Sequence, residues 1–371
     1  MSAGPLVAAR NVAALLWRRA AAVPKRAVRL KRRAERARQQ AALFQAEWQI
    51  ERELAALARG RGPIIAGPWL SEVGFEALYW IPFLRWFEDQ YRVDRERVIA
   101  VSRGGVADWY RNVATQYVEI FDHFDPATFA QRNAQRRETA EGGGQKQTTQ
   151  SAFDEELIAI ARKAAGAPRA AVCHPSLMYR LFGQFWLGNR AADVVFRHTG
   201  YEAVQASATD SLGLPERFIA AKFYTGAALP DTPESRRGLR DLVRAAAARM
   251  PVVMLDTGLR TDEHEDYLFR DIPDVISLRD RLEPRTNLGV QTAVTAASRG
   301  FIGTCGSIAW LAPLLGVPTV AVYTDDRQLT THLYVARQAY RRMEAASFET
   351  LDLRAAQELD VLPPVPQQVG Q

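Results

Sequence analysis

Residues 300–319 combine a buried-strand pattern with a helix start. Apolar residues precede position 304 and helix-favouring residues follow position 307, so a strand and a helix are predicted. Small side chains fill the turn between them: Thr304, Cys305, Gly306 and Ser307. They let a ligand approach the backbone, and free N–H groups at a helix start favour negative charge. The pattern predicts an anion site, with a nucleotide diphosphate as first candidate and an ordinary turn capped by Ser307 as the alternative.

Basic side chains near strand ends could complete this site. Lys222 lies in the apolar run 218–224, and a lysine in a buried strand needs an anion, either a ligand or an internal acid. Arg103 follows the run 97–101 and can reach a phosphate or an acidic acceptor; a surface arginine is the alternative. Four more residues are expected to touch the nucleotide ligand: Thr257, Gly258, Arg285 and Asn287. For Asn287, helix capping is the alternative.

Two carboxylates at the start of the aromatic helical pattern 75–90 are candidates for a general base. A carboxylate there can remove a proton from an acceptor hydroxyl. Glu76 is our first candidate for the base and Glu72 our second. The alternative role for both is to stabilise the helix start by their negative charge. Three further residues are predicted on the acceptor side of the site: Gly74, Arg103 and His174.

Strands, turns and helices alternate along most of the chain, which predicts βαβ units. Apolar runs predict strands in the first half at 63–67, 97–101, 117–121 and 170–173. In the second half they predict strands at 218–224, 252–256, 275–278, 300–303 and 319–323. Ligands bind outside the carboxyl ends of such parallel strands, so candidate residues that follow different strands can converge.

The predicted fold class is α/β, with two Rossmann-like lobes preceded by a long basic helix. We expect a basic helical arm over 1–62, a first lobe over 63–210, a second lobe over 211–345 and a C-terminal tail over 346–371. Residues 126–152 are rich in Gln, Arg, Thr and Gly, and are predicted to be a flexible insertion in the first lobe.

The arm carries the charge imbalance of the chain. The net charge is +6, but residues 1–62 contain 14 Lys/Arg against 4 Asp/Glu, so the rest is mildly acidic. A high pI is therefore no evidence that the whole chain binds nucleic acid. Residues 25–59 are predicted as one helix with a mostly alanine heptad stripe, a weak seam for a homodimer. The basic part of residues 1–59 suits an anionic membrane surface; a solvated helix without a partner is the alternative.

The composition of the chain excludes several classes of protein. The 371 residues are 47% hydrophobic and 24% charged, as in ordinary globular chains, and two cysteines exclude a disulfide framework. No run is long enough to span a bilayer and no signal-peptide pattern is present. The acidic run 262–266 has adjacent ligands, which favours an exposed loop over a metal site. We expect no metal, no cofactor, and a cytoplasmic, peripherally membrane-associated protein.

The segment 300–319 resembles the donor-site motif of GT-B glycosyltransferases, especially the heptosyltransferase-like and fucosyltransferase-like branches. Those enzymes place a glycine-containing turn, a short helix and a Gly-Val-Pro strand entry at the nucleotide sugar, and positions 316–318 match that entry. Lys222 matches a basic residue that faces the donor phosphates. Residues 67–82 are similar to the first loop and helix of heptosyltransferase-like enzymes, whose candidate base is an aspartate after a glycine. Phe75 stands there in this chain, so Glu72 or Glu76 would take that role.

The resemblance implies a metal-independent glycosyltransferase of the bacterial surface-polysaccharide type. Its partners would be a nucleotide sugar and a glycan or glycolipid acceptor, with residues 63–210 as the acceptor lobe and residues 211–345 as the donor lobe. Two other readings remain open: a non-catalytic α/β binding or scaffold protein whose basic arm binds membrane or nucleic acid, and an enzyme that epimerises or hydrolyses sugar nucleotides.

Overall fold

The computed structural model describes residues 33–35, 37–38, 40–139, 146–208, 212–259 and 264–358. The chain divides into two compact units, residues 1–53 and 54–371. Most of the predicted basic arm, including its apolar run, lies outside the described residues. Residues 40–59 are helical, as predicted for that part of the arm. Among the described helices, none is both long and apolar enough to cross a bilayer.

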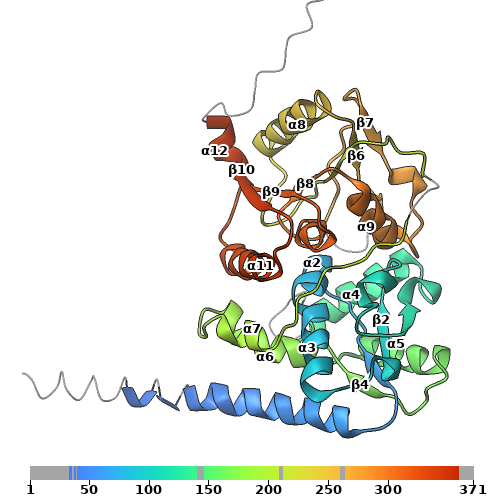
Figure 1. The fold of residues 1–371 in the computed structure, drawn as a ribbon, viewed down its shortest axis with the longest axis vertical. Helices are drawn as coiled ribbons and strands as arrows, with labels where there is room; N and C mark the ends of the chain where they lie inside the picture. The colour runs from blue at the N-terminus through green and yellow to red at the C-terminus, as the bar shows by residue number, and fades with distance from the viewer. Residues whose placement is uncertain are drawn as a thin grey trace, which may run out of the picture. The chain divides into compact units, whose positions relative to one another are not determined.

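Four parallel strands form the sheet of the first lobe (Figure 1). Their order is β3-β2-β1-β4, with bounds Gln116–Glu119, Val98–Ser102, Ile64–Ala66 and Ala171–Cys173. β1 is central, since Ile64 pairs with Val98 on one side and Ala171 on the other. Every residue of β1 and β2 is buried, which explains their continuous apolar runs.

Six parallel strands form the sheet of the second lobe. Their order is β10-β9-β8-β5-β6-β7, with bounds Phe348–Asp352, Thr319–Tyr323, Phe301–Thr304, Ile219–Lys222, Val252–Met254 and Val275–Ser277. The chain order reverses between β5 and β8, so the ends of these two strands mark the topological switch point. The two predicted Rossmann-like lobes are confirmed. The sequence placed residues from 346 onward in a tail, whereas β10 extends this sheet.

Helices surround both sheets. The first lobe contains α2 and α3 with a π-helix (η1) between them, and then α4 to α7, with bounds Val73–Phe75, Ile81–Tyr91, Glu76–Trp80, Pro126–Thr139, Ala152–Ala164, Ser176–Trp186 and Asp193–Arg197. The second lobe contains α8 to α12, with bounds Pro233–Ala247, Asn287–Ala297, Ile308–Leu311, Thr330–Met343 and Leu353–Glu358. Short 3₁₀ turns lie at Arg95–Arg97, Ala107–Tyr110, Ile120–Asp122, Arg279–Arg281 and Ala312–Leu315.

Pro82 explains the irregular helix over residues 73–91. It has no N–H, so the carbonyl of Leu78 has no helical donor four residues on. The hydroxyl of Tyr201 donates to that carbonyl instead, at 3.1 Å. Just before the proline the helix widens into the π-helix η1, where the N–H of Ile81 bonds to the carbonyl of Glu76. A π-turn inside an α-helix often lies at a functional site, and this one adjoins the cavity described below.

The segment 126–152 is more ordered than its composition predicts. Residues 126–139 form α4, in which Phe129 and Asn133 are buried. Gln147 is fully buried and its side-chain amide bonds to the loop after β1. The sequence predicted a flexible insertion because large apolar residues are scarce, but buried polar side chains anchor the segment. Residues 140–145 lie outside the described chain.

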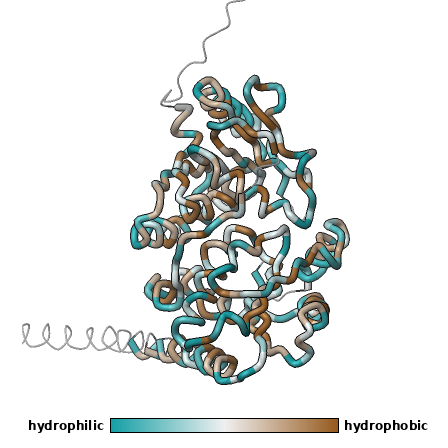
Figure 2. The backbone as a smooth tube through the Cα atoms, turned by 45° about the vertical axis from the view of Figure 1, so that its right-hand side comes forward, coloured by the Kyte–Doolittle hydropathy of each residue, from teal (hydrophilic) through white to brown (hydrophobic). Residues whose placement is uncertain are grey.

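Each lobe has its own hydrophobic core. The first is built around Ile65, Ile99 and Phe153, and the second around Phe223, Val252 and Leu239. Figure 2 shows hydrophobic segments inside both lobes and hydrophilic ones along many helices and loops. The polar site residues follow the strands that these cores hold in place.

Candidate functional site

A cavity of about 510 Å³ is lined by residues of both lobes. The second lobe contributes the ends of β5 and β8, where ligands bind in open α/β sheets. The first lobe contributes the turn after β2 and the start of the helix at Val73. Ten residues predicted from the sequence line it: Glu72, Gly74, Arg103, Lys222, Thr257, Asn287, Thr304, Cys305, Gly306 and Ser307.

Four predicted residues do not line the cavity. Glu76 is fully buried behind its wall. His174 is also buried, where its Nε2 contacts Asp154 at 3.1 Å and its Nδ1 accepts from the N–H of Ser176. Arg285 forms an exposed ion pair with Asp122. Gly258 packs against Arg279, whose Nε would lie 2.7 Å from an added Cβ.

The turn after β8 presents backbone N–H groups. Gly306 and Ser307 both have positive φ angles, +141° and +41°. The Thr304 hydroxyl accepts a hydrogen bond from the N–H of Tyr224 at 2.9 Å, and the N–H of Cys305 bonds to Val322. No hydrogen bond among the described residues uses the N–H of Gly306 or Ser307. Successive N–H groups in such a turn form an anion-binding concavity.

The first lobe reaches this turn through Gly74. A Cβ on Gly74 would lie 2.7 Å from the Ser307 nitrogen and 2.5 Å from Cδ1 of Trp310. Only glycine allows that approach, which brings Glu72 and the turn to the same cavity. The predicted turn therefore faces the loop at Gly74.

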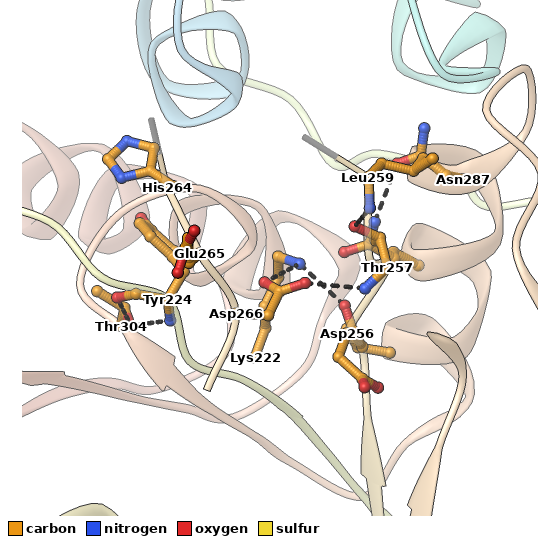
Figure 3. Close-up of polar contacts among 12 residues, drawn as sticks. Lys222, Tyr224, Asp256, Thr257, Leu259, His264, Glu265, Asp266, Asn287 and Thr304 are labelled. Atoms are coloured by element: carbon orange, nitrogen blue, oxygen red, sulfur yellow. Dashed lines mark hydrogen bonds and ion pairs between the residues drawn. The ribbon is translucent and has the colours of Figure 1, made fainter. Parts of the chain in front are cut away.

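Lys222 and Asp266 form an ion pair on the side of the cavity that the second lobe contributes (Figure 3). The Lys222 ammonium lies 3.1 Å from Asp266 Oδ1 and donates to the carbonyl of Leu255 at 2.9 Å. The other Asp266 oxygen accepts from the N–H of Thr257 at 2.8 Å. Of the two partners that the sequence left open for Lys222, the structure contains the internal acid. The acidic run 262–266 was expected to be exposed, which is wrong for Asp266, because its side chain is only 12% exposed. Residues 262–263 of that run lie outside the described residues.

Asn287 and Cys305 have mainly structural contacts. The Asn287 amide donates to the carbonyl of Pro284 at 2.7 Å and accepts from Gln291. Thr286, rather than Asn287, occupies the N-cap position of α9. Burial raises the pKa of the Cys305 thiol to about 12, so no thiolate forms near neutral pH.

Arg103 shapes the loop that carries Glu72. Its guanidinium is buried and donates to the carbonyls of Trp69 and Ser71, at 3.0 and 2.8 Å. The turn that follows Arg103 is fixed separately, because both carboxylate oxygens of Glu119 accept N–H groups of the two glycines at 104–105. Arg103 thus adds positive charge to the cavity wall while holding the loop.

Glu76 is a buried acid. The hydroxyls of Ser102 and Tyr110 donate to its Oε1 at 2.6 and 2.5 Å, while its Oε2 has no partner among the described residues. Burial raises its pKa to about 7, against the opposing effect of Arg103. It ties the helix that carries Gly74 to the end of β2, and it does not reach the cavity.

Glu72 is the carboxylate that the first lobe contributes to the cavity wall. It precedes α2 with an extended backbone, and its side chain does not cap the helix. This position at the helix start also fits the alternative considered for Glu72, stabilisation of the helix start by negative charge. Gly74, two residues on, contacts the Ser307 turn, so Glu72 and the N–H groups of Gly306 and Ser307 line the same cavity.

The lobes also meet at a second place. The carbonyl of Gly104 accepts a hydrogen bond from the N–H of Gly289 at 2.9 Å. Nearby, the Trp109 indole N–H donates to the Thr292 hydroxyl, also at 2.9 Å. With the contact at Gly74, these bonds hold the lobes together on two sides of the cavity.

Two cavity residues, Lys146 and Trp186, were not predicted from the sequence. Lys146 lies in the segment predicted as a flexible insertion. Trp186 ends an aromatic-rich helix that reads as core. Neither has a short-range spacing that distinguishes a ligand contact from packing, so only the fold reveals them.

The architecture is that of two Rossmann-like lobes with a cavity between the carboxyl ends of their sheets. No family model matches the sequence, and no curated protein matches it. Solved structures are similar in fold. Heptosyltransferase II, an ADP-heptose enzyme of E. coli, is 12% identical with a TM-score of 0.43, covering 81% of this chain and 98% of its own.

Two further solved structures show the same likeness. A family 9 glycosyltransferase from Veillonella parvula is 12% identical with a TM-score of 0.42, covering 84% of this chain and 92% of its own. E. coli heptosyltransferase WaaC, solved with ADP, is 14% identical with a TM-score of 0.36, covering 76% and 98%. The predicted resemblance to GT-B glycosyltransferases is thus found in the structure. At TM-scores below 0.5 it carries no argument about activity, which is argued below from the cavity.

Proposed function

We propose that this chain is a glycosyltransferase that moves a sugar from a nucleotide-diphosphate donor to a hydroxyl of a glycan or glycolipid. One observation carries the proposal: the N–H groups of Gly306 and Ser307 lie in the cavity wall at the switch point of the second sheet and bond to nothing in the described chain. A diphosphate bound there would accept both hydrogen bonds.

The second lobe supplies the donor site. Lys222 is held by Asp266, so it contributes a fixed donor in the wall rather than a full uncompensated charge. Thr257 is oriented by the same aspartate, through its backbone N–H. We assign Lys222, Thr257 and Asn287 to the nucleotide-sugar donor because they line the same side of the cavity.

The first lobe supplies the base. In the proposed reaction the acceptor oxygen bonds to the anomeric carbon of the donor sugar, and its proton passes to the Glu72 carboxylate. The bond from the anomeric carbon to the diphosphate oxygen breaks, and its electron pair leaves with the diphosphate. The Gly306 and Ser307 N–H groups stabilise the charge that develops there. Glu76 positions the helix behind this wall.

A thermal-shift screen with UDP, GDP, ADP and CMP tests the proposal. Ligand that binds only the native state stabilises it by about 2.7 kcal/mol at a concentration of 100 times Kd. We expect one nucleoside diphosphate to raise the melting temperature, and its sugar conjugate to donate to an acceptor. No shift with any nucleotide would overturn the proposal. Conversion of the sugar nucleotide without an acceptor would replace transfer by epimerisation or hydrolysis.

Metal independence is part of the proposal. Among the described residues, no group of three His, Cys, Asp or Glu ligands converges at the cavity. We expect transfer to continue in EDTA, and loss of transfer that Mg²⁺ restores would contradict this. The membrane and homodimer roles of residues 1–59 stay predictions.

A further inference from the structure

One side of the cavity is walled by aromatic rings. Phe75 and Trp186 have their ring centroids 5.5 Å apart, and His332 lies 4.9 Å from Phe75. All three side chains are half-buried and line the cavity. Tyr79 packs behind them, 5.2 Å from Trp186. Flat, partly exposed rings offer apolar contact area that a diphosphate does not need.

The histidine in this wall is neutral. The Tyr79 hydroxyl lies 2.7 Å from His332 Nδ1 and holds the imidazole ring in place. Burial lowers the pKa of His332 to about 4, with a further contribution from the positive charge of Lys146. Near neutral pH the imidazole therefore adds polarity to the wall but no charge.

Lys146 is the cation of this wall. Its ammonium lies 4.7 Å from the centroid of the Trp186 ring and 5.9 Å from that of Phe75. Partial burial lowers its pKa, while the Glu72 carboxylate opposes that shift. Among the described residues, no Asp or Glu oxygen lies within 4.0 Å of its ammonium nitrogen. A cation–π contact satisfies part of its charge, and its three N–H donors remain for a ligand.

The residue after Lys146 anchors it to the first lobe. The Gln147 side-chain oxygen accepts the N–H of Leu70 at 2.9 Å. Its NH₂ group donates to the carbonyl of Pro68 at 2.9 Å and to Asp154 at 2.8 Å. With Gln147 fully buried, the backbone beside Lys146 is held on the loop that leads to Glu72. A prearranged cation loses less entropy when it binds an anion.

We propose that Lys146, Trp186 and Phe75 bind an acceptor ring that carries an anionic group, a carboxylate or a phosphate. The inference rests on the proposed function and specifies its acceptor. The ring lies against the aromatic side chains and its anion meets the Lys146 ammonium. This places the acceptor beside Glu72, in the wall contributed by the first lobe. The alternative, that Lys146 binds the diphosphate of the donor, leaves the aromatic wall unexplained.

The test compares full-length wild type with Lys146→Met and Lys146→Arg, in the presence of the best nucleoside diphosphate from the screen. Saturation-transfer NMR gives the affinities for glucose 6-phosphate, glucuronate and glucose. We expect wild type to bind at least one anionic sugar about 10-fold or more tighter than glucose, because a charge-assisted hydrogen bond is involved. Lys146→Met removes this difference, and Lys146→Arg keeps most of it. If the affinity for glucose 6-phosphate depends on Lys146, the anion is a phosphate; if the affinity for glucuronate does, it is a carboxylate.

Two results would overturn the inference. One is glucose binding to wild type as tightly as both anionic sugars. The other is a loss of nucleoside-diphosphate affinity in Lys146→Met equal to any loss for the sugars, since Lys146 would then belong to the donor site. If anionic sugars bind through Lys146 but no nucleotide binds at all, the inference stands and the proposed function fails.

Discussion

The two walls of the cavity are built by different means. The wall of the second lobe presents backbone N–H groups at a strand end, those of Gly306 and Ser307, beside the Lys222–Asp266 ion pair. The wall of the first lobe is made of side chains from three separate segments, at Phe75, Lys146 and Trp186. Backbone amides suit a group that all nucleotide sugars share, whereas side chains suit the part of a substrate that differs between enzymes. We infer that the first wall sets specificity.

The largest expected effect comes from replacing Glu72, the carboxylate in the wall of the first lobe. Glu72→Gln keeps the size of the side chain but cannot take a proton, so we expect the rate of transfer to fall about 10²–10⁴-fold. Nucleotide affinity, measured by titration calorimetry, should stay close to wild type. Transfer at an undiminished rate would show that another group is the base.

The second prediction concerns the ion pair between Lys222 and Asp266 in the second lobe. Lys222→Met leaves Asp266 nearly buried without its cation, which should cost about 3 kcal/mol of unfolding free energy in urea titrations. The double variant with Asp266→Asn should recover part of that loss, because no uncompensated charge remains. Equal losses in the single and double variants would exclude a stabilising role for the pairing.

The third prediction concerns one methyl group added where the two lobes meet. Gly74→Ala places a Cβ 2.5 Å from Trp310 Cδ1 and 2.7 Å from the Ser307 nitrogen, so the lobes must move apart. A shift of about 1 Å at a reacting centre costs about 100-fold in rate. We expect transfer to fall by at least that factor, and nucleotide affinity to fall as well, because the methyl group crowds the Ser307 N–H that binds the diphosphate in the proposed reaction.

Gly183→Ala is the matched control for Gly74→Ala. Gly183 lies in helix α6 and an added Cβ meets nothing within 4 Å. Alanine is favoured over glycine in a helix, so the control should be as active as wild type and slightly more stable. A Gly74→Ala variant that behaves like this control would show that the close approach is unimportant.

The smallest effect concerns Glu76, the buried acid behind the first wall. Its pKa of about 7 lies above the ordinary value of 4.5, so the folded state holds a proton that the unfolded state releases. Stability from this group is therefore complete below pH 4.5 and is lost as pH rises through 7. Between pH 5 and 7 we expect wild type to lose about 1–2 kcal/mol relative to Glu76→Gln. If the unfolding free energies of wild type and Glu76→Gln, measured in urea, changed equally with pH, this prediction would be contradicted.

The sequence predicted the backbone wall because such a wall depends on local pattern. An apolar run, small residues and a helix start are contiguous at 300–319, and the structure forms β8, the turn and α10 there. The strand pattern likewise predicted both sheets, since strands buried on two faces read as continuous apolar runs.

The side-chain wall could not be predicted in the same way. Lys146 reaches the cavity because Gln147 is buried 77 residues along the chain from Leu70, its hydrogen-bond partner. Asp266 was expected to be exposed because the acids around it are adjacent, yet it faces Lys222 from 44 residues away. Glu72 precedes the helix with an extended backbone whereas Glu76 lies inside it, and their spacing of four residues does not reveal which one lines the cavity.

The central claim is that the turn after β8 binds a diphosphate through its backbone. The most direct test is to follow the backbone amide resonances of ¹⁵N-labelled protein while the nucleoside diphosphate from the screen is added, with the matching nucleoside as control. Our account predicts that the Gly306 and Ser307 amides shift most, and only when the diphosphate is present. Unmoved Gly306 and Ser307 amides in a protein saturated with the nucleotide would contradict it.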